Sequence, residues 1–257
     1  MEVLSLEIPE YLSPSSIDTF KTCPLKYKFS KIDKLLDLPS EATVLGNFVH
    51  DVLEDLFHLE PTDRTQVNAM RLLAEQWTRY WEDQVNSLDP IPDIKLFKWK
   101  ARWCVENYFE MESPDQISPH GMETEIPLVE VAGIPIKGFI DRWDPLDGGI
   151  RVVDYKTGKS PKPKYQDGKF QQLLIYADAL ETMTGKPAKS TALLFVKDKM
   201  TLEREVTPVD LNKMRDTVKS TYEGILERCE AEHFEPKKQI LCDWCSYKSI
   251  CPAWGAR

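Results

Sequence analysis

The sequence lacks any long run of apolar residues. No stretch approaches the ~20 consecutive apolar residues that a membrane-spanning helix requires, which excludes a transmembrane protein. The opening residues Met1–Ile8 lack the basic start and the apolar core of a secretory signal peptide. We therefore expect a cytoplasmic protein with no membrane partner. Internal repeats and low-complexity segments are also absent.

Positive charge is scarce as well. The 33 Lys and Arg residues are outnumbered by 42 Asp and Glu residues, which gives a net charge of −9 and argues against indiscriminate nucleic-acid binding over the whole surface. Two local stretches are basic in contrast to the whole chain, because Lys156–Lys169 and Lys21–Lys34 each contain five lysines. In the second stretch the lysines are interleaved with aromatic residues. Such mixtures suit a phosphate backbone with stacked bases, but a solvated loop and an ordinary helix face have the same composition.

Hydrophobic spacing predicts both helices and strands. The helices begin near Ser13 and cover about 45–58, 65–88, 94–112, 170–180 and 208–231. The strands cover 123–131, two segments of a hairpin between 138 and 156, and then 190–196 and 202–206. The 257 residues therefore divide into a mainly helical part at 1–112, an α/β part at 113–231 and a tail at 232–257.

Two of the predicted helices, 65–88 and 94–112, are rich in tryptophan. We interpret these side chains as core: Trp77, Trp81, Trp99 and Trp103. Cys104 shares an apolar stripe with its helix neighbours and is expected to be a buried thiol.

The hairpin carries the residues with the clearest chemistry. Asp154 and Lys156 are two apart on one strand and therefore project on the same face. If the turn is centred on Asp147–Gly148, a favoured two-residue turn, antiparallel pairing sets Asp141 directly opposite Asp154. Two facing carboxylates repel each other unless a cation lies between them, and their oxygen atoms suit Mg²⁺ or Mn²⁺. The group suits phosphodiester hydrolysis, but an exposed hairpin face with a cross-strand Asp–Lys pair is an equal alternative.

Other polar residues accompany the hairpin. His50 lies at the margin of an apolar helix stripe, where a lone histidine is more often a hydrogen-bonded core residue than a metal ligand. Gln172 and Tyr176 are four apart on a helix and meet on one face. Gly158-Lys-Ser160 follows a strand, but the phosphate-loop motif requires a glycine where this chain has Val153, so a nucleotide-hydrolysing motor is rejected.

The cysteines form a separate pattern. Cys242, Cys245 and Cys251 lie close together near the chain end, a spacing that favours metal binding over disulfides in a cytoplasmic protein. Cys104 and Cys229 lie in apolar helix stripes, whereas Cys23 precedes a proline at a polar helix end, as Cys251 does. Cys23 is therefore our fourth ligand. Four thiolates suit either Zn²⁺ or an iron–sulfur cluster, and the spacing does not choose between them.

Together these motifs resemble the RecB-type branch of the PD-(D/E)xK nucleases, in particular members with an iron–sulfur cluster such as the AddB nuclease domain and the CRISPR-associated single-strand exonucleases. The resemblance runs from Cys23 to Cys251 in the order of the family. The matching segments are Gly46–His50, Gly138–Asp141, Asp154–Lys156, Gln172–Tyr176 and the four cysteines.

The resemblance implies roles for these residues. His50, Asp141 and Asp154 would bind metal with the Tyr155 carbonyl, and Lys156 would be the catalytic lysine. Gln172 and Tyr176 would position the DNA strand or the lysine. Glu125 is the expected equivalent of a glutamate that family members often carry on the preceding strand. For Cys23, Cys242, Cys245 and Cys251 the resemblance favours a [4Fe–4S] cluster over Zn²⁺.

The resemblance also implies a single nuclease domain of α/β class, in which a central mixed β-sheet of restriction-endonuclease type is flanked by helices. The implied activity is a Mg²⁺- or Mn²⁺-dependent DNA exonuclease on single-stranded ends, in the 5′ to 3′ direction, in recombination, repair or phage DNA metabolism. Any helicase or recombination protein would be a separate partner. The alternatives are a non-cleaving DNA-end-binding module of a helicase–nuclease or CRISPR adaptation complex, and a zinc-ribbon-like interaction protein.

Overall fold

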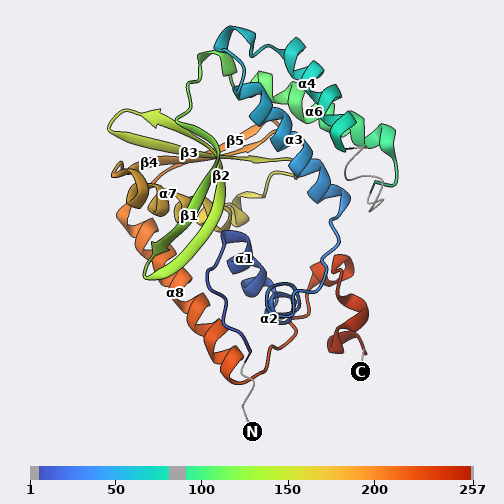
Figure 1. The fold of residues 1–257 in the computed structure, drawn as a ribbon, viewed down its shortest axis with the longest axis vertical. Helices are drawn as coiled ribbons and strands as arrows, with labels where there is room; N and C mark the ends of the chain where they lie inside the picture. Colours follow the sequence, from blue (N-terminus) through green and yellow to red (C-terminus); the bar gives the residue numbers. More distant parts are fainter. Residues whose placement is uncertain (1–5, 81–90, 256–257) are drawn as a thin grey trace. The chain divides into compact units, whose positions relative to one another are not determined.

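The computed structural model describes residues 6–80 and 91–255, and it contains a five-stranded mixed sheet flanked by helices (Figure 1). The strands follow one another across the sheet in chain order. Strands β2 and β3 are antiparallel, β3 and β4 are parallel, and β4 and β5 are antiparallel. Their bounds are β1(Gly121–Val131), β2(Ile134–Leu146), β3(Gly149–Lys156), β4(Ala188–Phe195) and β5(Met200–Glu205).

The register of the β2–β3 hairpin agrees with the prediction. Trp143 pairs with Val152 and Leu146 pairs with Gly149, so Asp147 and Gly148 form the two-residue turn. Gly148 has a φ of +72°, a left-handed conformation that glycine adopts without steric cost and that such turns require. The turn therefore fixes which residues of the two strands face each other.

The chain forms two compact units, each built from separate segments. Unit 1 comprises Met1–Leu38, Ile126–Gly138 and Pro208–Arg257. Unit 2 comprises Pro39–Glu125 and Phe139–Thr207. In the part of the chain that the structure describes, no helix is long and apolar enough to cross a membrane.

Unit 2 contains a core shared by three helices and the sheet. Helices α3(Glu41–Phe57), α4(Gln66–Tyr80) and α6(Ile94–Met111) pack against one another (Figure 1). The predicted apolar stripe of α3 is buried, and it joins side chains of β3 and β4 in one core. Its members are Val49, Val52, Leu53 and Leu56. Helix α7(Gln171–Thr184) packs on β3 and β4.

The tryptophans of α6 correct the sequence prediction, because they are exposed instead of buried. Trp99 is 57% exposed and Trp103 is 40% exposed. The buried stripe of α6 is instead formed by smaller and more evenly spaced side chains, namely Phe97, Ala101, Cys104, Val105 and Tyr108. Burial raises the pKa of Cys104 to about 11, as expected for an inert thiol. Trp77 is half-buried, while Trp81 and the end of the predicted 65–88 helix lie outside the described residues.

In unit 1, the helix expected to carry Cys23 ends before it. Helix α1(Pro14–Thr22) is capped by Ser13, whose side chain accepts a hydrogen bond from the Ser16 amide. Cys23 is extended, with φ −160° and ψ 111°, because the following proline disfavours a helical conformation at the preceding residue. The short helix α2(Pro24–Tyr27) and the π-helical turn η1(Lys28–Ile32) follow.

The remaining part of unit 1 is the C-terminal region. Helix α8(Pro208–Glu230) packs against α1. After it, the chain has only short 3₁₀ turns at Ile240–Trp244, Lys248–Ile250 and Pro252–Trp254. Cys242 lies in the middle of the first turn, and Cys245 and Cys251 directly follow the first and the second turn.

Candidate metal and catalytic site

The two aspartates and the lysine meet on one face of the β2–β3 hairpin in unit 2. Asp141 and Asp154 are buried, with 7% and 2% exposure. The Asp141 Oδ2 atom accepts a hydrogen bond of 2.8 Å from the Tyr155 amide, which spans the two strands. Lys156 donates to Asp154 Oδ1 at 2.8 Å, as expected for residues two apart on a strand. The hairpin thus brings two buried carboxyl groups and one partly exposed amine together in a single site.

The electrostatics of this site favour a bound cation. Burial and the charge of Asp141 raise the pKa of Asp154 to about 6. Burial also raises the pKa of Asp141, although His50 and Lys156 oppose the shift. Two carboxyl groups in one poorly solvated site do not readily ionise together unless positive charge is added. Carboxylate oxygens are the ligands that a divalent ion such as Mg²⁺ prefers, so this buried pair of carboxyl groups fits a divalent metal ion.

His50 comes from α3 and faces the same site. Its Nε2 lies 2.9 Å from the Tyr155 carbonyl oxygen, which can only accept, so Nε2 carries a proton and donates. Its Nδ1 lies 3.5 Å from Asp141 Oδ2 and 3.6 Å from Glu123 Oε1. A histidine that donates one ring N–H to a backbone carbonyl and turns the other nitrogen to carboxylates has the usual orientation of a metal ligand.

The charge of His50 depends on these neighbours. Burial lowers its pKa, but the charge of Asp141 and the hydrogen bond with Glu123 outweigh burial and raise the pKa to about 9. In the metal-free protein, His50 is therefore protonated near neutral pH. A metal ion must displace that proton before Nδ1 can act as a ligand.

Glu123, and not the expected Glu125, lies beside His50 and Asp141 in the structure. His50, Glu123 and Asp141 each offer one atom to a group whose atoms lie within 4.8 Å of one another. Glu125, the expected residue, is exposed. The alternation of a regular strand would place both glutamates on one face, but Glu123 has a φ of +39°, which interrupts that alternation. Nothing in the sequence indicates that a residue other than glycine adopts a left-handed backbone conformation at this position.

The backbone of Tyr155 holds two groups of the site together. Its amide donates to Asp141 and its carbonyl accepts from His50, so the carbonyl orients the histidine in this structure. Its side chain is buried, and its hydroxyl accepts a hydrogen bond of 2.6 Å from Arg142.

Gln172 and Tyr176 lie on the first turns of α7. The Gln172 amide donates to the Tyr176 hydroxyl at 3.4 Å, as their helical spacing predicts. Burial raises the pKa of Tyr176 to about 12, and the charges of Asp141 and Asp154 contribute to the shift. The tyrosine hydroxyl is therefore a neutral hydrogen-bonding group close to the two carboxylates.

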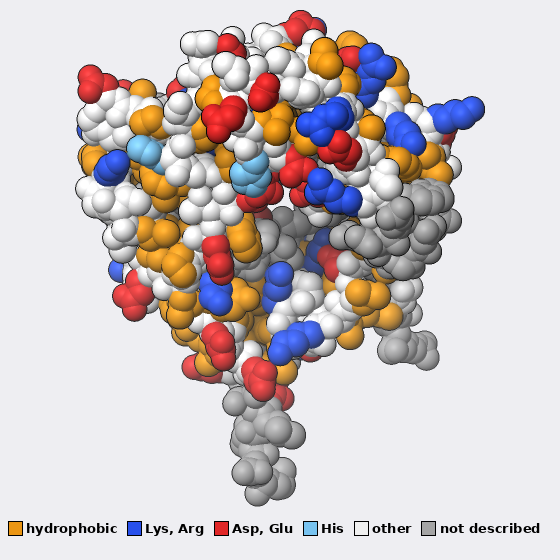
Figure 2. Space-filling view, turned by 45° about the horizontal axis from the view of Figure 1, so that its top comes forward, with side chains coloured by type: hydrophobic (Ala, Val, Ile, Leu, Met, Phe, Trp, Pro, Cys, Tyr) orange, Lys and Arg blue, Asp and Glu red, His pale blue; other side chains and the backbone are white. Residues whose placement is uncertain are grey.

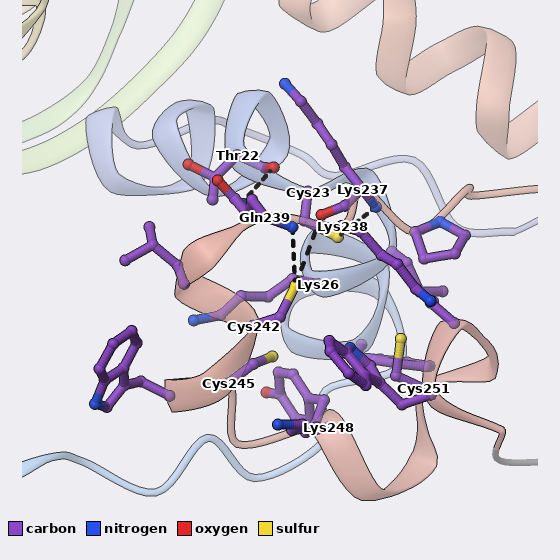
Figure 3. A pocket seen from close by; sticks show the side chains of 18 residues that line it. Thr22, Cys23, Lys26, Lys237, Lys238, Gln239, Cys242, Cys245, Lys248 and Cys251 are labelled. Carbon is purple, nitrogen blue, oxygen red and sulfur yellow. Dashed lines mark hydrogen bonds between the residues drawn. The ribbon is translucent and has the colours of Figure 1, made fainter.

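The four expected cysteine ligands line one pocket of about 220 Å³ in unit 1, which Figure 3 shows from close by. They are Cys23, Cys242, Cys245 and Cys251. The Lys237 amide donates to Cys23 Sγ and the Gln239 amide donates to Cys242 Sγ, both at 3.4 Å. No three cysteine sulfur atoms in the described part of the chain lie within 4.8 Å of one another. The other two cysteines, Cys104 and Cys229, are buried in helix packing.

Comparison with known proteins agrees with this fold and site. The family model of the PD-(D/E)XK nuclease superfamily matches residues 11–252, so the chain belongs to that superfamily and is a nuclease by family. Members of the superfamily use divalent metal ions, and the residues around Asp141 can hold one.

Individual relatives extend over nearly the whole chain. The Gene 69 protein of Mycobacterium phage D29 is 26% identical over 269 residues, and the match covers 94% of this chain and 96% of the phage protein. The Gene 69 protein of Mycobacterium phage L5 is 24% identical, with the same coverage. A solved structure named "Putative exonuclease", from Eubacterium rectale, has a similar fold, with a TM-score of 0.60 and 19% identity over 93% of this chain and 88% of that one.

Proposed function

We propose that this protein is a metal-dependent exonuclease of the RecB type that hydrolyses single-stranded DNA from its ends in the 5′ to 3′ direction. The buried pair of Asp141 and Asp154, with Lys156 bonded to one of them, is the observation that carries the proposal. The name of the Eubacterium rectale structure supports an exonuclease, and the origin of the two relatives in phages supports a role in phage DNA metabolism. A role in recombination or repair rests on the family resemblance alone.

The metal-binding residues would be Asp141, Asp154, His50 and Glu123. When bound there, Mg²⁺ or Mn²⁺ supplies polarisation of the scissile phosphate and a lower pKa for an attacking water. Tyr155 contributes by orienting His50 through its carbonyl and Asp141 through its amide. In this proposal Glu123 is a metal ligand in place of the Tyr155 carbonyl, which the family resemblance had implied as one.

Lys156 would act on the phosphate side of the site. Its ammonium group, held by Asp154, offsets the negative charge that builds on the phosphate and orients the attacking water. Gln172 and Tyr176 would position the DNA strand, because a neutral amide and a neutral hydroxyl donate hydrogen bonds to phosphate oxygen atoms.

The cysteine pocket would hold a [4Fe–4S] cluster. Four thiol groups line it, and backbone amides point at two of the sulfur atoms, as in sites that stabilise thiolate charge. The family resemblance favours such a cluster over a single tetrahedral Zn²⁺. The cluster would join Cys23 to the C-terminal turns without taking part in hydrolysis, because phosphodiester cleavage transfers no electrons.

The test uses protein purified without oxygen and single-stranded DNA blocked at its 5′ or its 3′ end. With Mn²⁺ or Mg²⁺ we expect degradation of the 3′-blocked strand and protection of the 5′-blocked strand and of circular single strands. Degradation that begins at the 3′ end would show that the direction of cleavage is opposite to the proposed one. The absence of cleavage with either metal would reject the exonuclease and favour a DNA-end-binding module of a larger helicase–nuclease assembly.

A further inference from the structure

Helix α6 presents two stacked tryptophans to solvent. The rings of Trp99 and Trp103 are 5.6 Å apart with an interplanar angle of 15°. Their exposures of 57% and 40% are unusual, because large aromatic side chains gain most from burial. The pair is one helical turn apart and forms a flat aromatic surface whose outer face is open.

The surface is held firmly in place. The Trp103 indole N–H donates to the Lys197 carbonyl at 3.2 Å. One turn further along α6, the Asn107 amide donates to the carbonyl oxygens of Val196 and Lys197 at 2.9 and 3.1 Å. Asn107 is only 1% exposed, so these bonds are protected from water. The tryptophan pair is therefore oriented before any ligand arrives.

The same bonds connect this surface to the candidate catalytic lysine within unit 2. Val196, next to Lys197, donates its amide to the Lys156 carbonyl at 3.1 Å. Lys156 is also paired with Phe195 across β3 and β4. Trp103 is thus bonded to the segment that leaves β4 beside Lys156, at the carboxyl end of two parallel strands, where ligands of open α/β sheets commonly bind.

The charge around the tryptophans suits a polyanion. Within Ile94–Val105 there are four basic residues and no acidic one, in a chain whose net charge is −9. Lys197 and Lys199 follow on the adjoining segment and are exposed. The pairs that basic residues of this surface form with Glu41, Glu106 and Glu110 are partly or largely exposed, so they oppose an incoming phosphate only weakly. Figure 2 shows Lys and Arg side chains among hydrophobic ones over the region of α4 and α6.

From these observations we propose that the open face of Trp99, supported by Trp103, is a stacking platform for the bases of single-stranded nucleic acid, with the surrounding lysines on the phosphates. Unpaired bases have free faces that stack on aromatic rings, whereas the bases of a duplex stack on one another. The platform deepens the proposed function, on which it rests for the placement of the scissile phosphate at Asp154 and Lys156. It selects single strands before the strand reaches the metal.

The experiment compares Trp99→Leu with the conservative control Trp99→Phe in the full chain. Leucine keeps apolar bulk and removes the aromatic face, whereas phenylalanine keeps a smaller one. Binding of a fluorescein-labelled (dT)₂₀ strand and of a 20-base-pair duplex is measured by anisotropy in EDTA. We expect Trp99→Leu to weaken single-strand binding about 5- to 150-fold, the range for loss of one base–aromatic stack, while Trp99→Phe stays within about threefold and duplex binding is unchanged.

A cleavage assay with Mn²⁺ completes the test, and we expect a raised KM for Trp99→Leu with a smaller change in kcat. Single-strand binding of Trp99→Leu equal to that of wild type overturns the platform. An equal loss for single strand and duplex, or a changed oligomeric mass in light scattering with unchanged DNA binding, also overturns it. A wild-type protein that never cleaves overturns the proposed function alone, because the binding measurement needs no divalent metal.

Discussion

At the scale of single residues, the site contains two buried carboxyl groups that repel each other. Asp141 and Asp154 have the same charge, and burial keeps water from screening it. The amide of Tyr155 donates to one oxygen of Asp141, and the amine of Lys156 lies 2.8 Å from Oδ1 and 2.7 Å from Oδ2 of Asp154. The arrangement is costly in the empty protein and favourable once a cation is bound.

Replacing Asp154 should therefore separate stability from activity. We expect Asp154→Asn to lower the cleavage rate at least ~100-fold, because the metal loses a charged ligand and charge in the transition state loses its partner. The melting temperature of the metal-free protein should stay the same or rise, since the change removes a buried like-charge contact. Cleavage by Lys156→Met should fall similarly. Near wild-type cleavage by either variant would refute the assignment.

The pH dependence of stability should change sign with metal. His50 has a folded-state pKa of about 9, above its usual 6.5, so its stabilising charge is present at low pH and is lost as the pH rises towards 9. Asp154, whose pKa is raised from 3.8 to about 6, makes the metal-free fold less stable as the pH rises between those two values, so its effect lies mainly below the range from pH 6 to pH 9. In EDTA the melting temperature should fall from pH 6 to pH 9. Saturating Mn²⁺ binds the deprotonated groups, so the increase that it causes should grow over the same range.

His50→Gln provides the control for this titration. Without the histidine, the melting temperature in EDTA should fall less steeply above pH 6.5. Excess Mn²⁺ should restore part of the cleavage activity that is lost at low metal concentration. A core histidine would behave otherwise, because its loss would lower the melting temperature at every pH and added metal would not restore activity.

At the scale of elements, a buried arginine joins α6 to the hairpin. Arg142 on β2 is fully buried, and it donates to Tyr155 on β3 and Tyr108 on α6. It also forms a two-pronged ion pair with Glu112, the residue that ends α6, at 2.7 and 2.9 Å. Arg142 directly follows Asp141, so the network fixes the part of β2 that carries a metal ligand.

Two glutamates at the end of α6 offer a matched comparison. We expect Glu112→Ala to lower the free energy of unfolding by about 3 kcal/mol, because Arg142 would remain buried without its main partner. Glu110→Ala removes an exposed pair with Lys199 and should cost less than about 1 kcal/mol. Urea titrations of both variants provide the measurement. Equal costs would show that the buried network does not hold α6 to the hairpin.

The sequence predicted local pairing well because local rules decide it. The hairpin register follows from the turn residues Asp147–Gly148, and the break before Pro24 could have been read from that proline alone. Trp99 and Trp103 were misplaced because apolarity was taken as burial, while the stripe that includes Phe97 and Ala101 competed for the same core.

Glu123 shows a different limit. Its position depends on a positive φ angle that its residue type does not favour. The sequence has glutamates at 123 and 125 and does not indicate which of them faces Asp141. The convergence of α3, β1 and β2 on one point is likewise a product of tertiary packing, and only the family resemblance pointed to it.

At the scale of the whole molecule, distant parts of the chain meet at the cysteine pocket. Cys23 lies more than 200 residues before the other three cysteines, yet the Lys237 amide donates to its sulfur. The C-terminal turns have many exposed hydrophobic side chains and few buried ones, so packing alone holds them weakly. A bound cluster would provide the missing attachment, because ligand-dependent sites contribute their binding energy to folding.

Cys23→Ser should accordingly remove the broad absorption near ~400 nm expected of an iron–sulfur cluster, and leave the protein prone to aggregation. Cys104→Ser and Cys229→Ser should keep the colour, because both thiols are buried in helix packing outside the pocket. Iron and sulfide analysis of protein purified without oxygen provides the measurement. Stoichiometric zinc would reject the cluster, and full iron content in Cys23→Ser would reject Cys23 as a ligand.

The interleaving of the two units has a consequence for synthesis on the ribosome. Unit 2 ends at Thr207, so all of its residues have been made while α8 and the three C-terminal cysteines are still to come. Unit 1 begins with the first residues of the chain but needs the last ones, and α1 must wait for α8 before it can pack. The hydrolytic site can therefore form once the chain up to Thr207 has emerged, whereas the cysteine pocket can form only after Cys251 has also emerged.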